Sequence, residues 1–92
     1  AVVETLLGWL AGVRQELSER HWSGTVLSIV EDLVDWPVIT SAFVQQKYGV
    51  SPPTAKSAID RLCEIGVLAE ITGRTYNRAF GARAVIDAVE RL

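Results

Sequence analysis

The segment from residue 51 to residue 80 constrains the fold of this 92-residue chain more than any other part of the sequence. It predicts a helix, because Ser51 can cap the first turn and the next two residues are prolines, which fit there at little cost. Apolar residues then recur at helical spacing and define an inner face of Ala55, Ala58, Ile59 and Leu62. Gly66 supplies the left-handed residue that ends many helices, so the helix is expected to stop at about Ile65.

A hairpin is expected directly after this helix. Residues 67–72 and 76–80 have the composition and alternation of short strands, and Gly73 with Arg74 supplies the reversal between them. Arg74 and Arg78 flank the tip of this hairpin, so positive charge is expected there.

A shorter helix is expected just upstream, over residues 41–48, with Thr40 as its cap and Gly49 as its end. The three-residue connection that begins at Gly49 has the length of the turn in a helix-turn-helix. A helix, a glycine turn, a second helix, a glycine and a hairpin in this order predict a winged helix-turn-helix. Residues 51–65 would form its recognition helix and the hairpin its wing. An ordinary pair of antiparallel helices in a small bundle is the alternative.

Two further helices are expected in the N-terminal part of the chain. Apolar residues follow a helical period over residues 3–17 and 26–34, with a break at residues 23–24. The second helix should end near Trp36, since the residue before Pro37 is biased away from helical backbone angles. The expected fold class is therefore mainly α with a small β-hairpin, a winged helix-turn-helix preceded by a helical pair.

We expect the chain to divide into a helical linker segment, residues 1–36, and a winged helix-turn-helix domain, residues 37–92. A last helix near residues 82–92 should pack against the core or extend into a dimer contact. Gly8 and Gly12 either let another helix approach the first helix closely or break it. Large aromatic residues occur in the core more often than at an interface. We therefore expect Trp9, Trp22 and Trp36 to lie in the core, and an interface with a partner is the alternative.

Charge is unevenly distributed along the chain, although its net value is only −2. Residues 40–83 contain six cations and three anions, whereas residues 1–39 contain two cations and six anions. The positive charge therefore coincides with the expected recognition helix and wing, which favours a nucleic-acid partner. Asp60 and Glu64 on the same helix oppose a tight complex, because DNA phosphates repel carboxylates.

The sequence contains no candidate catalytic or metal-binding residues. The single cysteine, Cys63, and the single histidine, His21, suggest neither a metal site nor an activated nucleophile, and no cofactor is expected. The apolar segments are shorter than the roughly 20 residues that a membrane span needs. No targeting signal is present, so a cytoplasmic location is expected.

The predicted DNA contacts lie on the recognition helix and around the wing. On the helix they are Ser51, Thr54, Lys56, Ser57 and Arg61, whose N-terminal members would approach base edges in the major groove. Around the wing they are Lys47, Arg74, Asn77 and Arg78, whose charges would hold the DNA backbone or the minor groove. The alternative is a protein-interaction or dimerisation module that uses the tryptophan-bearing helices and the mixed-charge face of residues 55–64.

The run V-S-P-P-T-A-K-S-A-I-D-R-L from residue 50 and the run G-R-T-Y-N-R from residue 73 point to a known family. Over residues 36–92 the chain resembles the C-terminal winged-helix domain of many bacterial Fic-family proteins, and residues 1–35 match it only as a helical pattern. Fic domains transfer AMP from ATP to a hydroxyl side chain of a target protein, with a motif of the form H-P-F-x-x-G-N-G-R. That motif is absent from this chain.

The resemblance implies a non-catalytic DNA-binding or regulatory domain. Its expected partners are double-stranded DNA, the Fic catalytic domain of the same polypeptide and a second copy of the chain. Because the sequence starts without an initiator methionine in the middle of an expected helix, we expect it to be a fragment of a larger protein.

Overall fold

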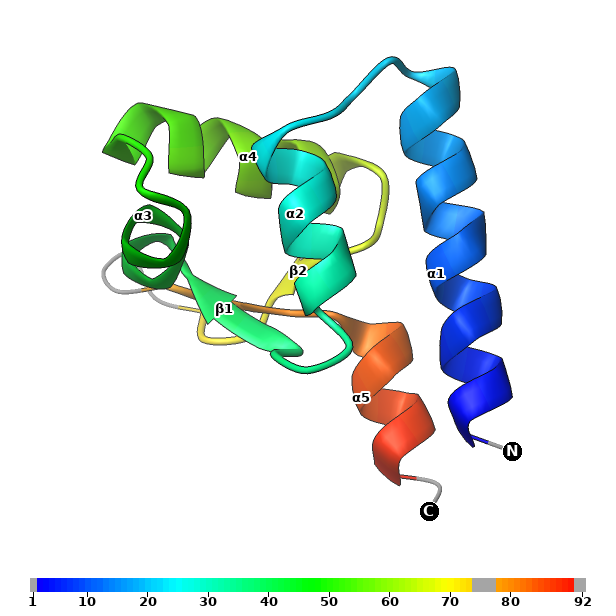
Figure 1. Cartoon of the computed structure of the whole chain (residues 1–92). Helices are drawn as coiled ribbons and strands as arrows, with labels where there is room; N and C mark the ends of the chain where they lie inside the picture. The colour runs from blue at the N-terminus through cyan, green and yellow to red at the C-terminus, as the bar shows by residue number, and fades with distance from the viewer. Residues whose placement is uncertain (1, 74–77, 91–92) are drawn as a thin grey trace.

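The computed structural model describes residues 2–73 and 78–90, and these ranges contain five helices and three short strands. In chain order the elements are α1 (Val2–Glu19), α2 (Thr25–Asp32), β1 (Val38–Thr40), α3 (Ser41–Tyr48), α4 (Pro52–Glu64), β2 (Ala69–Glu70), β3 (Ala79–Gly81) and α5 (Arg83–Glu90). Figure 1 shows α4 lying across the top of the molecule beside α2, and α1 running next to α5.

The strands form one antiparallel sheet in the order β1-β3-β2. Phe80 of β3 pairs with Ile39 of β1 on one side and with Glu70 of β2 on the other. This arrangement places the β2–β3 wing beside the α3–α4 pair. The predicted fold class, mainly α with a small β-hairpin in a winged helix-turn-helix, is therefore confirmed.

Local signals place α3 and α4 where the sequence predicts them. The Thr40 hydroxyl accepts from the Phe43 N–H at 3.1 Å, and Gly49 ends α3 in the left-handed region with a φ of 64°. The Ser51 hydroxyl caps α4 by accepting from the Thr54 N–H at 3.4 Å. Both helices start and stop at residues whose preferences need no tertiary support.

Other element boundaries differ from the predictions. The helix expected to end near Trp36 ends at Asp32, and a turn follows in which the Trp36 N–H donates to the Asp32 carbonyl at 2.8 Å. β1 was not predicted; it exists because Ile39 and its neighbours pair with β3. The break considered at Gly8 or Gly12 is wrong, since α1 is continuous through both.

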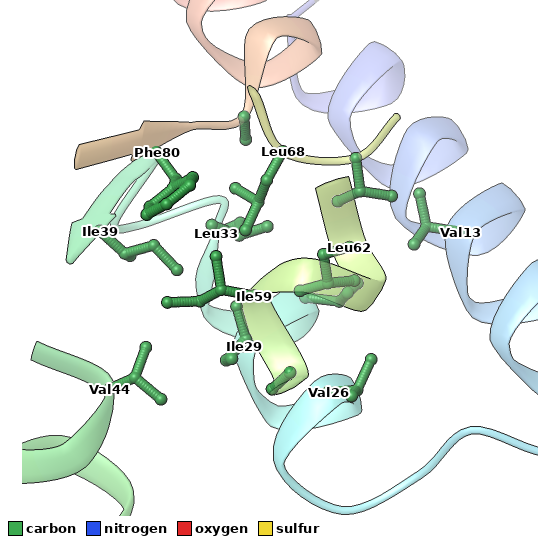
Figure 2. Close-up of a cluster of buried hydrophobic side chains, with 14 of the residues drawn as sticks. Val13, Val26, Ile29, Leu33, Ile39, Val44, Ile59, Leu62, Leu68 and Phe80 are labelled. Carbon is green, nitrogen blue, oxygen red and sulfur yellow. The ribbon is translucent and has the colours of Figure 1, made fainter. Parts of the chain in front are cut away.

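One hydrophobic core connects the helices and the sheet, and its centre is shown in Figure 2. The predicted inner face of α4 is confirmed, because Ala55, Ala58, Ile59 and Leu62 are all buried. Residues on both sides of position 36 contribute to this core, among them Leu17, Ile29, Leu62 and Val85. Half-buried Cys63 packs against it, and burial raises the pKa of its thiol.

Helix α1 is buried along one side from its middle to its C-terminal end, and Leu6 packs partly against the core nearer its start. Leu10, Val13 and Leu17 enter the core, whereas Val3 and Leu7 are 66% and 61% exposed. Among the tryptophans, Trp9 and Trp22 pack partly against the core, as predicted, but Trp36 is half exposed and stacks at a tilt on Phe43. Within the described ranges, no helix has both the length and the apolar character of a membrane span.

Candidate nucleic-acid interface

The outward side of α4 is polar and exposed, because its inner side is fully committed to the core. We call this surface the recognition face. It comprises the exposed residues Pro52, Pro53, Thr54, Lys56, Ser57, Asp60, Arg61 and Glu64. The sequence-predicted contacts on the helix all fall on this face or, in the case of Ser51, at its N-terminal edge.

The first turn of α4 offers few free hydrogen-bond donors. Pro52 and Pro53 have no N–H group, and the Thr54 N–H is already bonded to the Ser51 hydroxyl. The same hydroxyl lies 3.0 Å from the Thr54 hydroxyl. An anion therefore gains little from the backbone at this helix start, and its contacts must come from side chains.

A wide groove runs along the side of α4 that faces the wing. This wing-side groove has a volume of about 860 Å³ and lies between α3, α4 and β3, with walls that include Gln45, Pro52, Lys56, Arg78 and Phe80. It brings together two of the predicted DNA contacts, Lys56 and Arg78, from elements far apart in the sequence.

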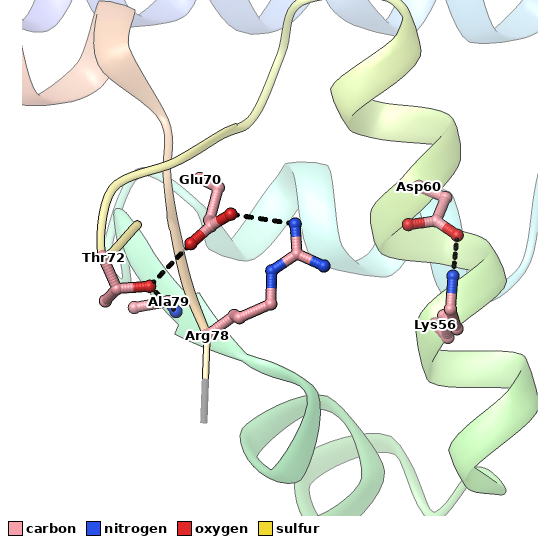
Figure 3. Close-up of polar contacts among 6 residues, drawn as sticks. All are labelled: Lys56, Asp60, Glu70, Thr72, Arg78 and Ala79. Carbon is pink, nitrogen blue, oxygen red and sulfur yellow. Dashed lines mark hydrogen bonds and ion pairs between the residues drawn. The ribbon is translucent and has the colours of Figure 1, made fainter. Parts of the chain in front are cut away.

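Both of these cations are paired with carboxylates of the chain itself, as Figure 3 shows. The Lys56 amine lies 2.6 Å from the Asp60 carboxylate, one helical turn away, and the Arg78 guanidinium lies 2.9 Å from Glu70. Arg78 also lies over the Phe80 ring. The positive charge on this side is therefore largely neutralised before any ligand arrives.

The Glu70 carboxylate is held by two groups of the wing. The Thr72 hydroxyl donates to it at 2.9 Å, and this bond together with Arg78 lowers the pKa of Glu70. Thr72 in turn accepts from the Ala79 N–H at 3.3 Å. The Arg78–Glu70 pair is thus part of a connected polar network across the hairpin.

A smaller groove lies on the opposite side of α4, next to the start of α2. This α2-side groove has a volume of about 320 Å³, and its polar walls include Ser23, Thr25, Thr54, Ser57 and Arg61. The Arg61 guanidinium stacks over the Trp22 ring, 5.4 Å from its centroid. Three predicted contacts, Thr54, Ser57 and Arg61, therefore share this groove with residues that precede the helix-turn-helix.

Lys47 lies in neither groove, since it sits near the end of α3, 5.9 Å from the Trp36 ring and 6.0 Å from the Tyr48 ring. Tyr48 donates to the Asp32 carboxylate at 2.6 Å and so ties α3 to α2. Burial, followed by this bond to an anion, raises the pKa of the Tyr48 hydroxyl. The remaining predicted contacts, Arg74 and Asn77, lie outside the described residues.

Two residues of the site were not predicted from the sequence. Glu70 was counted only as one anion, although strand register places Arg78 diagonally across the hairpin from it. A correct register would have indicated this pair. Trp22 was assigned to the core or to a partner, and no local pattern links it to Arg61, which meets it only through the packing of α2 on α4.

No protein-family model matches the chain, and no curated protein is similar enough to count as a relative. Within the described residues, no group of three or more histidine, cysteine, aspartate or glutamate side chains could hold a metal ion. The resemblance to the Fic-family winged-helix domain remains a prediction.

Proposed function

We propose that this chain is a non-catalytic winged-helix domain that binds duplex DNA through α4, and that it serves a Fic-family protein adenylyltransferase as a regulatory part. The observation that carries the DNA-binding proposal is the division of α4 into a buried apolar face and an exposed face on which six of eight residues are polar or charged. A helix with one fully exposed polar face, flanked by a wing, fits the major groove of B-DNA.

The dimensions and chemistry of α4 support this proposal. Its 13 residues extend over about 20 Å, and the major groove, about 12 Å wide, admits one helix. Thr54 and Ser57 present hydroxyl groups in the N-terminal half, where they can contact base edges. Asp60 is paired with Lys56, and Glu64 lies at the far end of the helix, so the N-terminal half of the recognition face carries no unpaired carboxylate.

The balance of charge sets the expected strength of binding. The recognition face carries two cations, Lys56 and Arg61, and two anions, Asp60 and Glu64, and the whole chain carries −2. We therefore propose weak, salt-dependent binding with little preference for DNA sequence, in which each phosphate contact adds about 1 to the magnitude of the salt slope.

The test is duplex binding by the folded chain at low salt, compared with the variant Thr54→Glu. A glutamate three residues after the Ser51 cap favours the helix, so α4 keeps its stability while its leading turn repels phosphate. The matched control is Ala84→Glu, which adds the same charge to the first turn of α5. We expect Thr54→Glu to lose duplex binding and Ala84→Glu to keep it. A folded wild-type chain that retards no duplex at low salt would refute the proposal.

A second function is favoured by one specific observation, the exposed apolar surface on α1 and α5. Val3 and Leu7 lie one helical turn apart on α1, and Val89 of the neighbouring α5 is 45% exposed. Gly8 and Gly12 lie on the open surface of α1, since a Cβ atom added at either position would have no neighbouring atom within 4 Å. This surface would dock the Fic catalytic domain of the same polypeptide or a second copy of the chain.

Sedimentation equilibrium tests this second proposal. We expect the wild-type chain to self-associate with rising concentration, or to bind its Fic catalytic domain, and Leu7→Glu to abolish this. Ser18→Glu, at the other exposed end of α1, is the control that should leave association unchanged. A chain that stays monomeric and ignores the catalytic domain would contradict it.

A further inference from the structure

Arg61 differs from the other described cations beside the recognition face. Lys56 and Arg78 each form an ion pair with a carboxylate of the chain. Among the described residues, Arg61 forms none, and its contact is the Trp22 ring. Its charge is therefore available to an external anion without separating an existing pair.

Hydroxyl groups converge on the groove into which Arg61 reaches. Ser23 and Thr25 line it from the start of α2, and Ser57 lines it from α4. Within residues 2–73 and 78–90, none of these three side chains forms a hydrogen bond with another residue. The groove therefore combines one uncompensated cation with several unused donors, which is the chemistry that a phosphate group requires.

The way in which α1 ends places the Trp22 ring that Arg61 contacts. His21 adopts a left-handed backbone with a φ of 58°, and the Trp22 N–H returns to the Leu17 carbonyl at 2.9 Å. This turn brings the Trp22 ring under Arg61, while Arg20, paired with Glu16, lies 5.2 Å from the same ring. An arginine held on an aromatic surface loses less side-chain entropy when it binds an anion.

We propose that the α2-side groove binds a phosphate group of the DNA backbone, with Arg61 as the charged contact and the Thr25 and Ser57 hydroxyls as hydrogen-bond donors. This inference rests on the DNA-binding function proposed above. It assigns to Arg61, one of the DNA contacts predicted on the recognition helix, a contact with the DNA backbone. It also makes the connection between α1 and α2 part of the DNA interface.

Salt dependence distinguishes a phosphate contact from a base contact. The logarithm of the binding constant would be measured against the logarithm of salt concentration for two duplexes of unrelated sequence. For Arg61→Ala we expect binding to both duplexes to weaken by the same factor, and the magnitude of the slope to fall by about 1. Arg83→Ala, which removes an exposed arginine from the start of α5, should leave the slope unchanged.

A second pair of variants tests the groove without removing Arg61. Ser57→Asp places a carboxylate one helical turn before Arg61, where it can pair with the guanidinium and repel phosphate. Ser57→Asn has nearly the same size without the charge. We expect Ser57→Asp to reproduce the loss seen with Arg61→Ala, and Ser57→Asn to bind duplex DNA nearly as well as the wild type.

Inorganic phosphate provides a probe that is independent of DNA. In amide spectra of the wild-type chain, phosphate should shift the signals of Thr25, Ser57 and Arg61, and these shifts should be absent in Arg61→Ala. Duplex binding with an unchanged slope in Arg61→Ala and no phosphate shifts at the groove would overturn this inference while the proposed function stands. A wild-type chain that binds no duplex would remove both, whatever inorganic phosphate does.

Discussion

The two sides of α4 differ in how available their charge is. The wing-side groove is the larger and contains Lys56 and Arg78, but each is paired with a carboxylate of the chain. The α2-side groove is smaller and contains Arg61, which rests on Trp22. An exposed ion pair stabilises a protein by only about 0–1 kcal/mol, so a phosphate can displace the carboxylate from its cation. The displaced carboxylate stays nearby, however, and its negative charge repels the phosphate. The number of cations on a surface therefore does not decide where an anion binds.

The largest effect on stability is expected from the buried face of α4, which lies beneath both grooves. Leu62 is fully buried beneath α4, and Leu62→Ala should lower the free energy of unfolding by about 2–5 kcal/mol through the lost contacts and the cavity. Chemical denaturation followed by circular dichroism measures this change. Glu64→Ala, on the exposed side of the same helix, should change it by less than about 0.5 kcal/mol. A loss of stability that is no larger for Leu62→Ala than for Glu64→Ala would contradict the assigned inner face.

The hydrogen bond from Tyr48 to Asp32 ties α3 to the C-terminal end of α2. Tyr48→Phe removes the hydroxyl that donates to Asp32 and should cost about 1 kcal/mol of unfolding free energy near neutral pH. Because folding raises the pKa of Tyr48, its contribution is complete below pH 10.0, its ordinary value, and is lost as the pH rises above it. Denaturation of wild type and variant at pH 7 and above pH 10 should show the difference shrinking, and a constant difference would argue against this hydrogen bond.

Removing the carboxylate that pairs with Arg78 should leave the wing-side groove with an unpaired arginine, as in the α2-side groove. Glu70→Gln removes the paired charge and keeps an acceptor for Thr72, so duplex binding should tighten severalfold and the salt slope should steepen by about 1. Glu90→Gln removes one carboxylate from α5 as the control for net charge. Equal gains in the two variants would mean that net charge, and not the pairing of Arg78, limits binding on this side.

The smallest effect concerns the stability of the wing in acid. Folding lowers the pKa of Glu70 from its ordinary value of 4.5, so its contribution to stability is present above that pH and is lost as the pH falls through the lowered value. Denaturation at pH 6 and at pH 3 should therefore show a smaller acid-induced loss in Glu70→Gln than in the wild type. Identical losses would mean that the Arg78–Glu70 pair contributes nothing measurable.

Local signals explain which parts of the fold could be predicted from the sequence. The caps Thr40 and Ser51 and the ends of α3 and α4 depend on neighbouring residues alone, and those predictions are confirmed. β1 could not be predicted in the same way, because three residues after a proline become a strand only by pairing with β3. The sequence likewise shows which cations are exposed, but not that Arg78 meets Glu70 or that Arg61 meets Trp22.

The most direct test of this account compares Arg61→Ala with Arg78→Ala in one salt series on the same duplex. Each variant removes one positive charge beside α4, from opposite grooves. The account predicts that Arg61→Ala weakens binding and lowers the magnitude of the salt slope by about 1, whereas Arg78→Ala changes neither appreciably. Loss of binding and slope in Arg78→Ala, with Arg61→Ala indistinguishable from the wild type, would contradict it.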